Sequence, residues 1–528
     1  MSYQPVLVAG QWRQPLEPAE SFTAVNPMTK TPLPEVYPVS GWGEVEEALI
    51  AGAEAAAALR EMPRASIAAF LEGFAAGIEE RAQAIVDLAF TETALPIEPR
   101  LRSVELPRTT DQLRQAAAAA RERSWCHATI DTARNIRSMY GPLGGPVVVF
   151  GPNNFPLAFN SASGGDAAAA LAAGNPVIAK ANTGHPGTTR LLAEAAFEAV
   201  QANGLPPATV QLLYRVKHDV GARLVSHPLV GATGFTGSRW AGLQLKAAAD
   251  QAGKPIYLEM SAINPVFVLP GALQERMEEI ADALFSSCSL GVGQFCTKPG
   301  LVVLLATPEA EAFLEAVADR FETPPGVLLG EGGVRTIAEA VERLREHGAS
   351  LVVGGTDVPG PSYRYANTLL RVSGDAFLEH PHALQTEAFG VVALVVVARD
   401  VAQMQAIAHA LEGSLTGSFY THTARVDDAL YDAVAPIVRE KVGRLLNDKM
   451  PTGVAVSPAM NHGGPYPATG HPGFTAVGIP AAMLRFGALH CYDNVRHHRL
   501  PAELQNRNPT GTMWRYIDGA WTQGDVAR

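Results

Sequence analysis

The feature that most constrains the fold is a regular alternation of short apolar runs with helical segments between Pro146 and Met260. Each run is continuously apolar, whereas a strand with one solvated face would alternate. Apolar strands separated by helices are typical of a parallel sheet that is covered on both faces. The pattern predicts a doubly wound α/β domain, which binds ligands at the carboxyl ends of its strands. The strand-like runs are PVVVFGP, PVIAK, TVQLLYR, LVGATGF and IYLEM.

A second α/β pattern follows from about Ala262 to Met450. Strand-like NPVFVLP, LVVLLA and VVALVVVA alternate there with helical stretches such as AEAFLEAVADRF. Before the first pattern, apolar residues recur at three and four positions from Val45 to Phe90, and another helical stretch covers Thr109 to Arg123. The chain therefore reads as α/β throughout, with a Gly-, Pro- and His-rich tail.

Composition excludes several classes of protein. The 41 basic and 52 acidic residues give a net charge of −11, which argues against a nucleic-acid-binding surface. The N-terminus lacks the basic and apolar regions of a signal peptide, and prolines interrupt the longest uncharged run, near Gly141–Gly165. The four cysteines have neither zinc-ligand spacing nor the density of a disulfide framework. We expect a cytoplasmic protein with no membrane segment and no metal site.

Cys296 is the first candidate for chemistry, because it stands in the glycine-rich turn Gly291–Thr297. A thiolate is a good nucleophile, and backbone N–H groups of such a turn are expected to lower the pKa of the thiol. The alternative is a buried apolar cysteine, the commoner fate of this residue type. Cys288 lies in an apolar helical run and favours that alternative, whereas Cys126 and Cys491 carry no local signal.

Two further polar residues end apolar strands. Glu259, in Tyr257–Ser261, is placed to act as a general base at the carboxyl end of a sheet, or to pair with a cation at its edge. Asn154 follows the strand PVVVF and can donate an N–H to a developing oxyanion, or simply form a turn.

Two features suit a nucleotide, although the dinucleotide fingerprint GxGxxG is absent. Lys180 ends the strand PVIAK and can bind a ribose or a phosphate, or solvate the strand end. The segment Phe235–Gly242 opens a helix after a strand, and a helix N-terminus with small residues suits a pyrophosphate. The plainer interpretation of Ser238 is a helix N-cap.

Taken together and in this order, these segments resemble the aldehyde dehydrogenase superfamily over nearly the whole chain. The resemblance implies that Cys296 is the nucleophile, Glu259 the general base and Asn154 the oxyanion donor. Ser261 and Ala262 replace the usual glycines after the base, and Val391 replaces a usual proline. The residues that the resemblance assigns to the cofactor are Lys180, Gly237, Ser238, Gly242, Glu387 and Phe389.

Several stretches resemble one branch, the ketoglutarate semialdehyde (2,5-dioxovalerate) dehydrogenases and their NADP-dependent fatty-aldehyde relatives. They are Lys180–Thr188, Phe295, His462–Thr469 and the tail with Leu500–Gln505. The branch implies a semialdehyde substrate such as 2,5-dioxopentanoate. A carboxylated substrate needs a cation, and the sequence leaves the choice open. The candidates are Arg100, Arg102, Arg108 and Arg114. An apolar tunnel would instead favour fatty or aromatic aldehydes.

Cofactor choice depends on the residue three positions after Lys180. An acid there would repel a 2′-phosphate, and this chain has the neutral Thr183. We therefore expect NADP⁺ to be accepted and favoured over NAD⁺. The branch often carries an arginine where this chain has His218, and its loss would weaken phosphate binding.

The family also implies a division into domains. We expect a cofactor-binding domain at residues 1–123 and 142–259, and a catalytic domain at 260–450. An oligomerisation strand at 124–141 and a tail at 451–528 would form a homodimer or homotetramer.

Three other classes of protein deserve comparison. A coenzyme A-acylating enzyme often lacks the general base, which is present here as Glu259. A cysteine hydrolase needs a histidine beside Cys296. The chain has fourteen histidines, and no motif places any of them there. A non-catalytic cofactor-binding homologue would be expected to lose Cys296 or Glu259.

Overall fold

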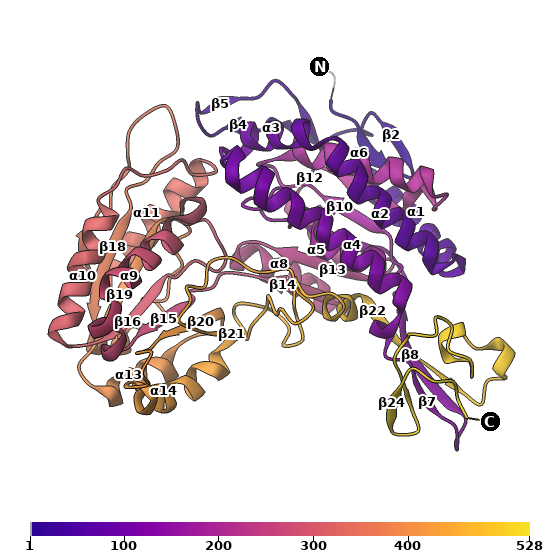
Figure 1. Cartoon of the computed structure of the whole chain (residues 1–528). Coiled ribbons are helices and arrows are strands. Elements are labelled where there is room, and N and C mark those ends of the chain that lie inside the picture. The colour runs from indigo at the N-terminus through magenta and orange to yellow at the C-terminus, as the bar shows by residue number, and fades with distance from the viewer. Residues whose placement is uncertain (1–2, 528) are drawn as a thin grey trace.

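The computed structural model describes residues 3–527 and shows two large α/β lobes with a small β extension (Figure 1). The first lobe holds a seven-stranded sheet in the order β14-β13-β9-β10-β11-β1-β2. Strands β9, β10, β11, β13 and β14 pair in parallel, and β1 and β2 form an antiparallel edge. The bounds are β1 Val6–Val8, β2 Gln11–Arg13, β9 Val147–Phe150, β10 Val177–Lys180, β11 Val210–Leu213, β13 Ala232–Thr236 and β14 Ile256–Glu259.

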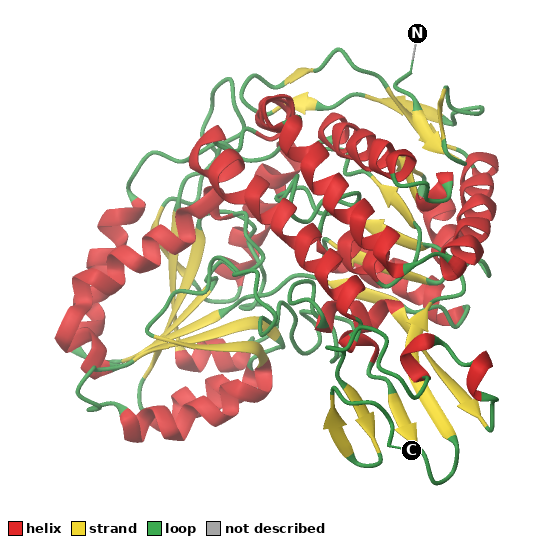
Figure 2. Ribbon diagram, turned by 45° about the vertical axis from the view of Figure 1, so that its right-hand side comes forward, coloured by secondary structure: helices red, strands yellow, loops and turns green. Residues whose placement is uncertain are grey.

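Helices cover both faces of this sheet (Figure 2), which is why its strands are continuously apolar. Alanine-rich α5 is buried along its whole length, since small side chains let it pack closely among the strands and α4. The bounds are α1 Trp42–Glu61, α2 Arg64–Glu80, α3 Ala82–Thr93, α4 Leu106–Glu122, α5 Gly165–Ala172, α6 Pro186–Ala202, α7 His218–Val225 and α8 Arg239–Gln251.

The second lobe holds another seven-stranded sheet, in the order β17-β18-β19-β16-β15-β20-β21, parallel except for β17. The strands are β15 Pro265–Val268, β16 Leu301–Leu305, β17 Ser350–Val353, β18 Thr368–Ser373, β19 Val392–Ala398, β20 Ser414–Tyr420 and β21 Val442–Asn447. The helices are α9 Pro270–Ser289, α10 Pro308–Phe321, α11 Glu331–Glu346, α12 Gly374–Glu379, α13 Val401–Ala410 and α14 Asp428–Lys441. The predicted architecture of two doubly wound α/β units is confirmed.

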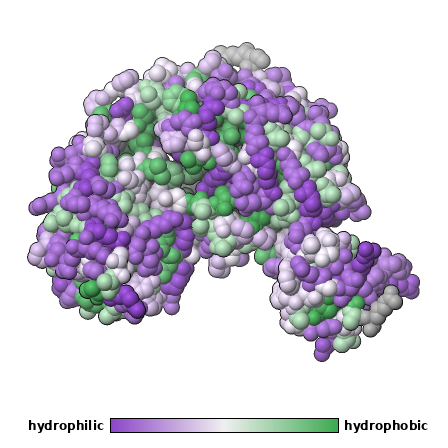
Figure 3. Space-filling model, viewed as in Figure 1, coloured by the Kyte–Doolittle hydropathy of each residue, from purple (hydrophilic) through white to green (hydrophobic). Residues whose placement is uncertain are grey.

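A five-stranded sheet, β22-β8-β7-β23-β24, forms the extension, which projects from the body in the space-filling view (Figure 3). It combines strands from two distant parts of the chain. The bounds are β7 Thr129–Asp131, β8 Ile136–Pro142, β22 Gly487–Asp493, β23 Arg515–Ile517 and β24 Ala520–Thr522. Two small sheets lie near the N-terminus, with β3 Glu20–Phe22, β4 Val25–Asn26, β5 Thr31–Pro32, β6 Tyr37–Ser40 and β12 Arg215–Val216.

The tail serves two parts of the molecule. Its last strands join the extension, but the stretch before them crosses the carboxyl end of β14. Thr469 bridges to Glu259, and the N–H of Met260 donates to the carbonyl of Ala468 at 2.8 Å. The tail therefore reaches the strand end where ligands of such sheets bind. Among residues 3–527, no helix is long and apolar enough to span a bilayer.

A buried ion pair fastens the tail to the first lobe. Arg485 Nη2 lies 2.7 Å from Asp166 Oδ1 on α5, and both side chains are almost fully buried. Removing one partner of a buried pair leaves an uncompensated charge, at a cost of about 3–5 kcal/mol. We therefore expect Arg485→Met to lower the free energy of unfolding by that amount.

Denaturant unfolding would measure this effect. The matched control is Arg121→Met, which breaks the exposed pair with Glu72 and should cost about 1 kcal/mol or less. Equal effects of the two variants would contradict the role assigned to the buried pair.

Candidate active site

Cys296 lies on a loop that is fixed from two sides. Gly293 has a positive φ of +69°, and a Cβ there would overlap the carbonyl of Gly390, so only glycine allows this close approach. On the other side, Asn264 Nδ2 donates to the carbonyls of Cys296 at 2.8 Å and of Lys298 at 3.0 Å. The position of the thiol is thus set by two contacts of its loop, one with the backbone of Gly390 and one with the side chain of Asn264.

Asn154 and Glu259 lie in the same cavity as Cys296, as the motifs predict. Asn154 is buried, and its Nδ2 donates to the carbonyl of Gln294 at 2.8 Å. An amide NH₂ carries two hydrogens, so one remains for a ligand. Glu259 ends β14 and is 1% exposed. Neither of its carboxylate oxygens has an aligned hydrogen bond within the described residues.

A third ionisable group, His462, completes this cluster. Its Nε2 lies 3.4 Å from Cys296 Sγ and 3.0 Å from Glu259 Oε1. No sequence motif placed a histidine beside Cys296, and the structure does place one there. The two residues are 166 positions apart, and only the return of the tail to β14 brings them together. The one signal in the sequence was the segment His462–Thr469, whose glycines let the chain pass close to other backbone.

Burial and neighbouring charge control the thiol. Burial and the carboxylate of Glu259 raise the pKa of Cys296 well above its usual range, and Glu387 adds to the effect, while the guanidinium of Arg108 opposes it. The expectation of a lowered pKa was wrong for this state of the protein. The loop follows a short 3₁₀ turn, Leu290–Gly293, and Cys296 does not begin a helix. The raised pKa favours the thiol over the thiolate.

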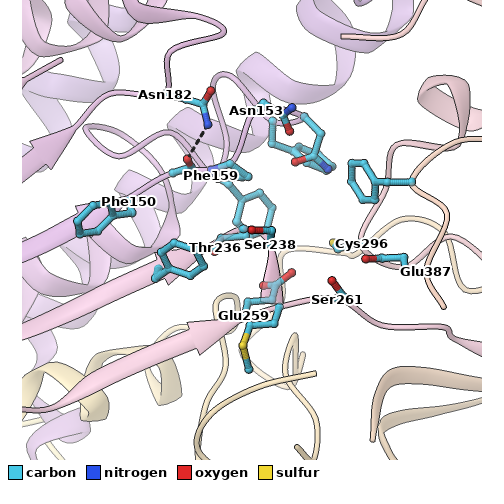
Figure 4. A pocket seen from close by; sticks show the side chains of 18 of the residues that line it. Phe150, Asn153, Phe159, Asn182, Thr236, Ser238, Glu259, Ser261, Cys296 and Glu387 are labelled. Atoms are coloured by element: carbon cyan, nitrogen blue, oxygen red, sulfur yellow. Dashed lines mark hydrogen bonds between the residues drawn. The ribbon is translucent and has the colours of Figure 1, made fainter. Parts of the chain in front are cut away.

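The cavity beside these residues has a volume of about 500 Å³, within the usual range for small-ligand sites. Figure 4 shows Ser261, Cys296 and Glu387 close together at one end of it, with Glu259, the last residue of β14, beside them. Asn182, Thr236 and Ser238 also line the cavity. Asn182 Nδ2 donates to the carbonyl of Gly151 at 3.1 Å, which ties the loops after β9 and β10 together.

The groups along this cavity fit a dinucleotide. Lys180 ends β10 at one side, and burial lowers its pKa to about 8. The N-terminus of α8 supplies N–H groups at the middle, and Ser238 also caps this helix by accepting from Ala241 N at 3.4 Å. Glu387 lies near the thiol, and burial raises its pKa to about 7. The cation of Lys180 suits a ribose or a phosphate, and the amides at the start of α8 suit a pyrophosphate. The carboxyl group of Glu387 suits a second ribose.

Of the remaining cofactor candidates, two line the cavity and two do not. Gly237 and Phe389 line the cavity with Ser238. Gly242 packs behind it, against Phe235 and Met260, where a larger side chain would push the helix away. Thr183 is half-buried in the loop after β10 but does not line the cavity.

The cluster of Glu259, Cys296 and His462 could also hold a metal ion, because their ligand atoms all lie within 4.8 Å of one another. The spacing of cysteines in the sequence gave no hint of such a set. Sulfur, imidazole and carboxylate together suit a thiophilic divalent cation such as Zn²⁺. A cation bound here would occupy the sulfur of Cys296 and remove it as a nucleophile.

The fold and the site define a two-lobed α/β protein with a cysteine, a glutamate and a histidine beside a cavity that fits a dinucleotide, and comparisons with known proteins give its family. The model of the aldehyde dehydrogenase family matches residues 12–435. Alpha-ketoglutaric semialdehyde dehydrogenase 2 from Azospirillum brasilense is 39% identical, over 93% of this chain and 94% of that protein. Alpha-ketoglutaric semialdehyde dehydrogenase from Acinetobacter baylyi is 35% identical, over 96% of each. The crystal structure of lactaldehyde dehydrogenase from Escherichia coli superposes with a TM-score of 0.78 at 23% identity, over 93% of this chain and 98% of that one.

The chain therefore belongs to the aldehyde dehydrogenase family, whose members are oxidoreductases that act on aldehydes with NAD(P)⁺. The resemblance predicted from the motifs is confirmed, and so is the similarity to ketoglutarate semialdehyde dehydrogenases.

The raised pKa of Cys296 predicts how the thiol reacts without cofactor. Its alkylation by iodoacetamide should be slow at neutral pH and accelerate as the pH rises, because only the thiolate reacts. Glu259→Gln removes a charge that raises this pKa, so the rate curve should move to lower pH. Mass spectrometry of the Cys296 peptide measures the rate separately from that of the exposed Cys491.

The control for this measurement is Glu98→Gln, which removes an exposed carboxylate and should leave the curve in place. A curve that does not move in Glu259→Gln would show that burial alone sets the pKa of the thiol.

Proposed function

We propose that this protein oxidises a semialdehyde, such as 2,5-dioxopentanoate, to the carboxylate with NAD(P)⁺, through a covalent intermediate on Cys296. The observation that carries the proposal is the convergence of Cys296, Glu259 and Asn154 at one end of a cavity that fits a dinucleotide. Both full-length relatives described above are named for a ketoglutaric semialdehyde.

The first step is attack by sulfur on the aldehyde carbon. The thiol proton passes to His462 Nε2, 3.4 Å away, and the adjacent carboxylate of Glu259 stabilises the resulting imidazolium. A C–S bond forms and the carbonyl π bond breaks, which leaves charge on oxygen. The free hydrogen of Asn154 Nδ2 and the backbone N–H of Cys296 hold this oxyanion, and each such donor contributes about 2.7–4 kcal/mol in other enzymes.

NAD(P)⁺ held in the cavity lined by Lys180, Ser238 and Glu387 would supply the hydride acceptor, and the oxidised carbon would remain attached to Cys296 as a thioester. Glu259 then takes a proton from a water molecule, whose oxygen attacks the thioester carbonyl. The C–S bond breaks, the carboxylate product leaves and Cys296 regains its proton. The burial of the cluster keeps solvent away from the thioester until that water is placed.

Lys180 and the loop after β10 are the proposed determinants of the cofactor. Thr183 is neutral, so it does not repel a 2′-phosphate. Burial, and to a smaller extent the charge of Arg215, lower the pKa of Lys180, so a second cation near Lys180 supports the binding of a 2′-phosphate. Lys217, in contrast, pairs with Glu20 at 2.8 Å. We propose that NADP⁺ is favoured on these grounds.

The domain assignment follows the same proposal. Residues 1–123 and 142–259 would hold the cofactor, and residues 260–450 would present Cys296. The extension, with residues 124–141 and much of 451–528, would pair with a second copy in a homodimer or homotetramer. Large apolar side chains that the extension exposes support this role, namely Leu489, Trp514 and Trp521.

The proposed activity is tested by the formation of reduced cofactor from a panel of aldehydes. The panel is 2,5-dioxopentanoate, succinic semialdehyde, hexanal and benzaldehyde, each with NAD⁺ and NADP⁺. We expect the highest kcat/KM with a semialdehyde, and Cys296→Ala should abolish turnover while still binding reduced cofactor. A preference for hexanal or benzaldehyde would indicate a broad fatty or aromatic aldehyde dehydrogenase. Cofactor binding with no turnover by the unmodified protein would indicate a non-catalytic homologue.

The cofactor preference has its own test. Thr183→Glu introduces a charge that repels the 2′-phosphate, so the NADP⁺/NAD⁺ ratio of kcat/KM should fall by about tenfold or more. Thr183→Gln has the same size without the charge and should leave the ratio nearly unchanged. If the two variants behave alike, Thr183 does not face the 2′ position.

A further inference from the structure

Four arginines lie in the segment that begins α4 and precedes it, and the structure separates them. Arg114 pairs with Glu79 at 2.6 Å, and Arg102 lies 3.6 Å from Glu98, all with solvent-exposed side chains. Arg100 is buried, pairs with Glu105 and donates to the carbonyl of Asn154. Its charge is therefore neutralised. Arg108 is the one of the four that forms no ion pair within residues 3–527.

Arg108 presents an unused pair of donors. Its Nη1 donates to the carbonyl of Val454 at 2.5 Å, which anchors the guanidinium. Its Nε and Nη2 are shielded from solvent and have no hydrogen-bond partner among the described residues. These two nitrogens share one edge of the planar group, and that edge matches the two oxygens of a carboxylate. Leaving such donors buried and unpaired is costly, so a ligand that pairs with both would relieve the cost.

The surroundings of Arg108 define a route to the thiol. Its guanidinium carbon lies 5.2 Å from the ring centre of Phe159 and 6.0 Å from that of Phe155. Both rings line the cavity that contains Cys296. The ring of Phe159 also lies 5.6 Å from that of His462. An aliphatic chain packed on these rings would therefore join the nucleophile to the free edge of Arg108.

Electrostatics agree with this placement. Burial lowers the pKa of Arg108, and the charges of Glu105, Cys296 and Glu259 oppose this change. The guanidinium in turn opposes the rise in the pKa of Cys296. The guanidinium is thus within Coulombic range of the reacting centre. Arg444 also interacts with Cys296 through Coulombic forces, but its nitrogens already donate to the carbonyls of Pro451 and Gly453. It adds positive potential to the region without offering the same free edge.

We propose that Arg108 binds the distal carboxylate of the substrate through Nε and Nη2, and so selects aldehydes that carry a carboxylate over neutral ones of the same length. This inference rests on the proposed function and specifies its substrate class. The reacting carbon lies at Cys296, the chain lies along Phe155 and Phe159, and the acid group ends at Arg108.

The test compares 5-oxopentanoate with pentanal, two aldehydes of equal chain length that differ in the terminal carboxylate. In Arg108→Met, which keeps an apolar stem on the rings, kcat/KM for 5-oxopentanoate should fall about 100-fold, the order expected when one partner of a buried charge pair is truncated. The value for pentanal should stay the same or rise. Arg108→Lys keeps the positive charge but loses the two-pronged guanidinium. Its kcat/KM for 5-oxopentanoate should therefore lie between the values of the unmodified protein and of Arg108→Met.

The matched control is Arg102→Met, which removes a solvent-exposed arginine and should change neither substrate. A retained preference of Arg108→Met for 5-oxopentanoate would overturn the inference. So would an equal loss on both aldehydes by a variant that unfolds at the same temperature as the unmodified protein. If Arg108→Met does not fold, Arg108→Lys decides by the same comparison.

A second readout separates this inference from the proposed function. Glutarate has the same chain length as 5-oxopentanoate and a carboxylate at each end, so calorimetry with glutarate needs no turnover. We expect the unmodified protein to bind glutarate and Arg108→Met to bind it about 100-fold more weakly. If neither aldehyde is oxidised but this difference holds, the proposed function fails and the carboxylate site stands. Equal binding by the two proteins would overturn the site.

Discussion

The structure depends on a carboxylate and a thiol that share one buried place. The carboxylate of Glu259 raises the cost of charging Cys296, and burial adds to that cost. His462 lies within 3.4 Å of the sulfur and 3.0 Å of the carboxylate, so it can accept the thiol proton. The glycines and asparagines around the loops fix this cluster, since Gly293 packs against the backbone of Gly390 and Asn264 donates to the carbonyl of Cys296.

Charge balance around the cluster follows a clear pattern. Buried arginines that hold the scaffold are paired or bound to carbonyls, as Arg485 is with Asp166 and Arg100 with Glu105. Arg108 differs from Arg485 and Arg100 in forming no ion pair within residues 3–527, and its Nε and Nη2 have no hydrogen-bond partner there. It also lies against the aromatic rings that line the cavity of Cys296. This combination is what makes it a candidate for binding a substrate.

The parallel strands of the first lobe could be predicted from the sequence, since apolar runs such as PVVVF and PVIAK are typical of a covered parallel sheet. Strands β17, β18, β20 and β21 of the second lobe were not predicted. Motifs after β9 and at the end of β14 also located Asn154 and Glu259, because parallel strands end at one edge of the sheet. The glycine-rich turn before β16 located Cys296. The state of the thiol was predicted wrongly. The glycine-rich turn suggested helix-like N–H groups, but burial beside Glu259 dominates the pKa.

What the sequence by itself determined is therefore the two α/β units, the family and the residues at strand ends, since periodicity and local motifs act over short stretches of chain. The tertiary structure decided the rest. His462 lies 166 residues after Cys296 in the sequence. It reaches Cys296 only because the tail crosses the end of β14. The choice among four arginines likewise required knowing which of them had found partners in space. Contacts between distant segments depend on how lobes pack, and no local pattern encodes that packing.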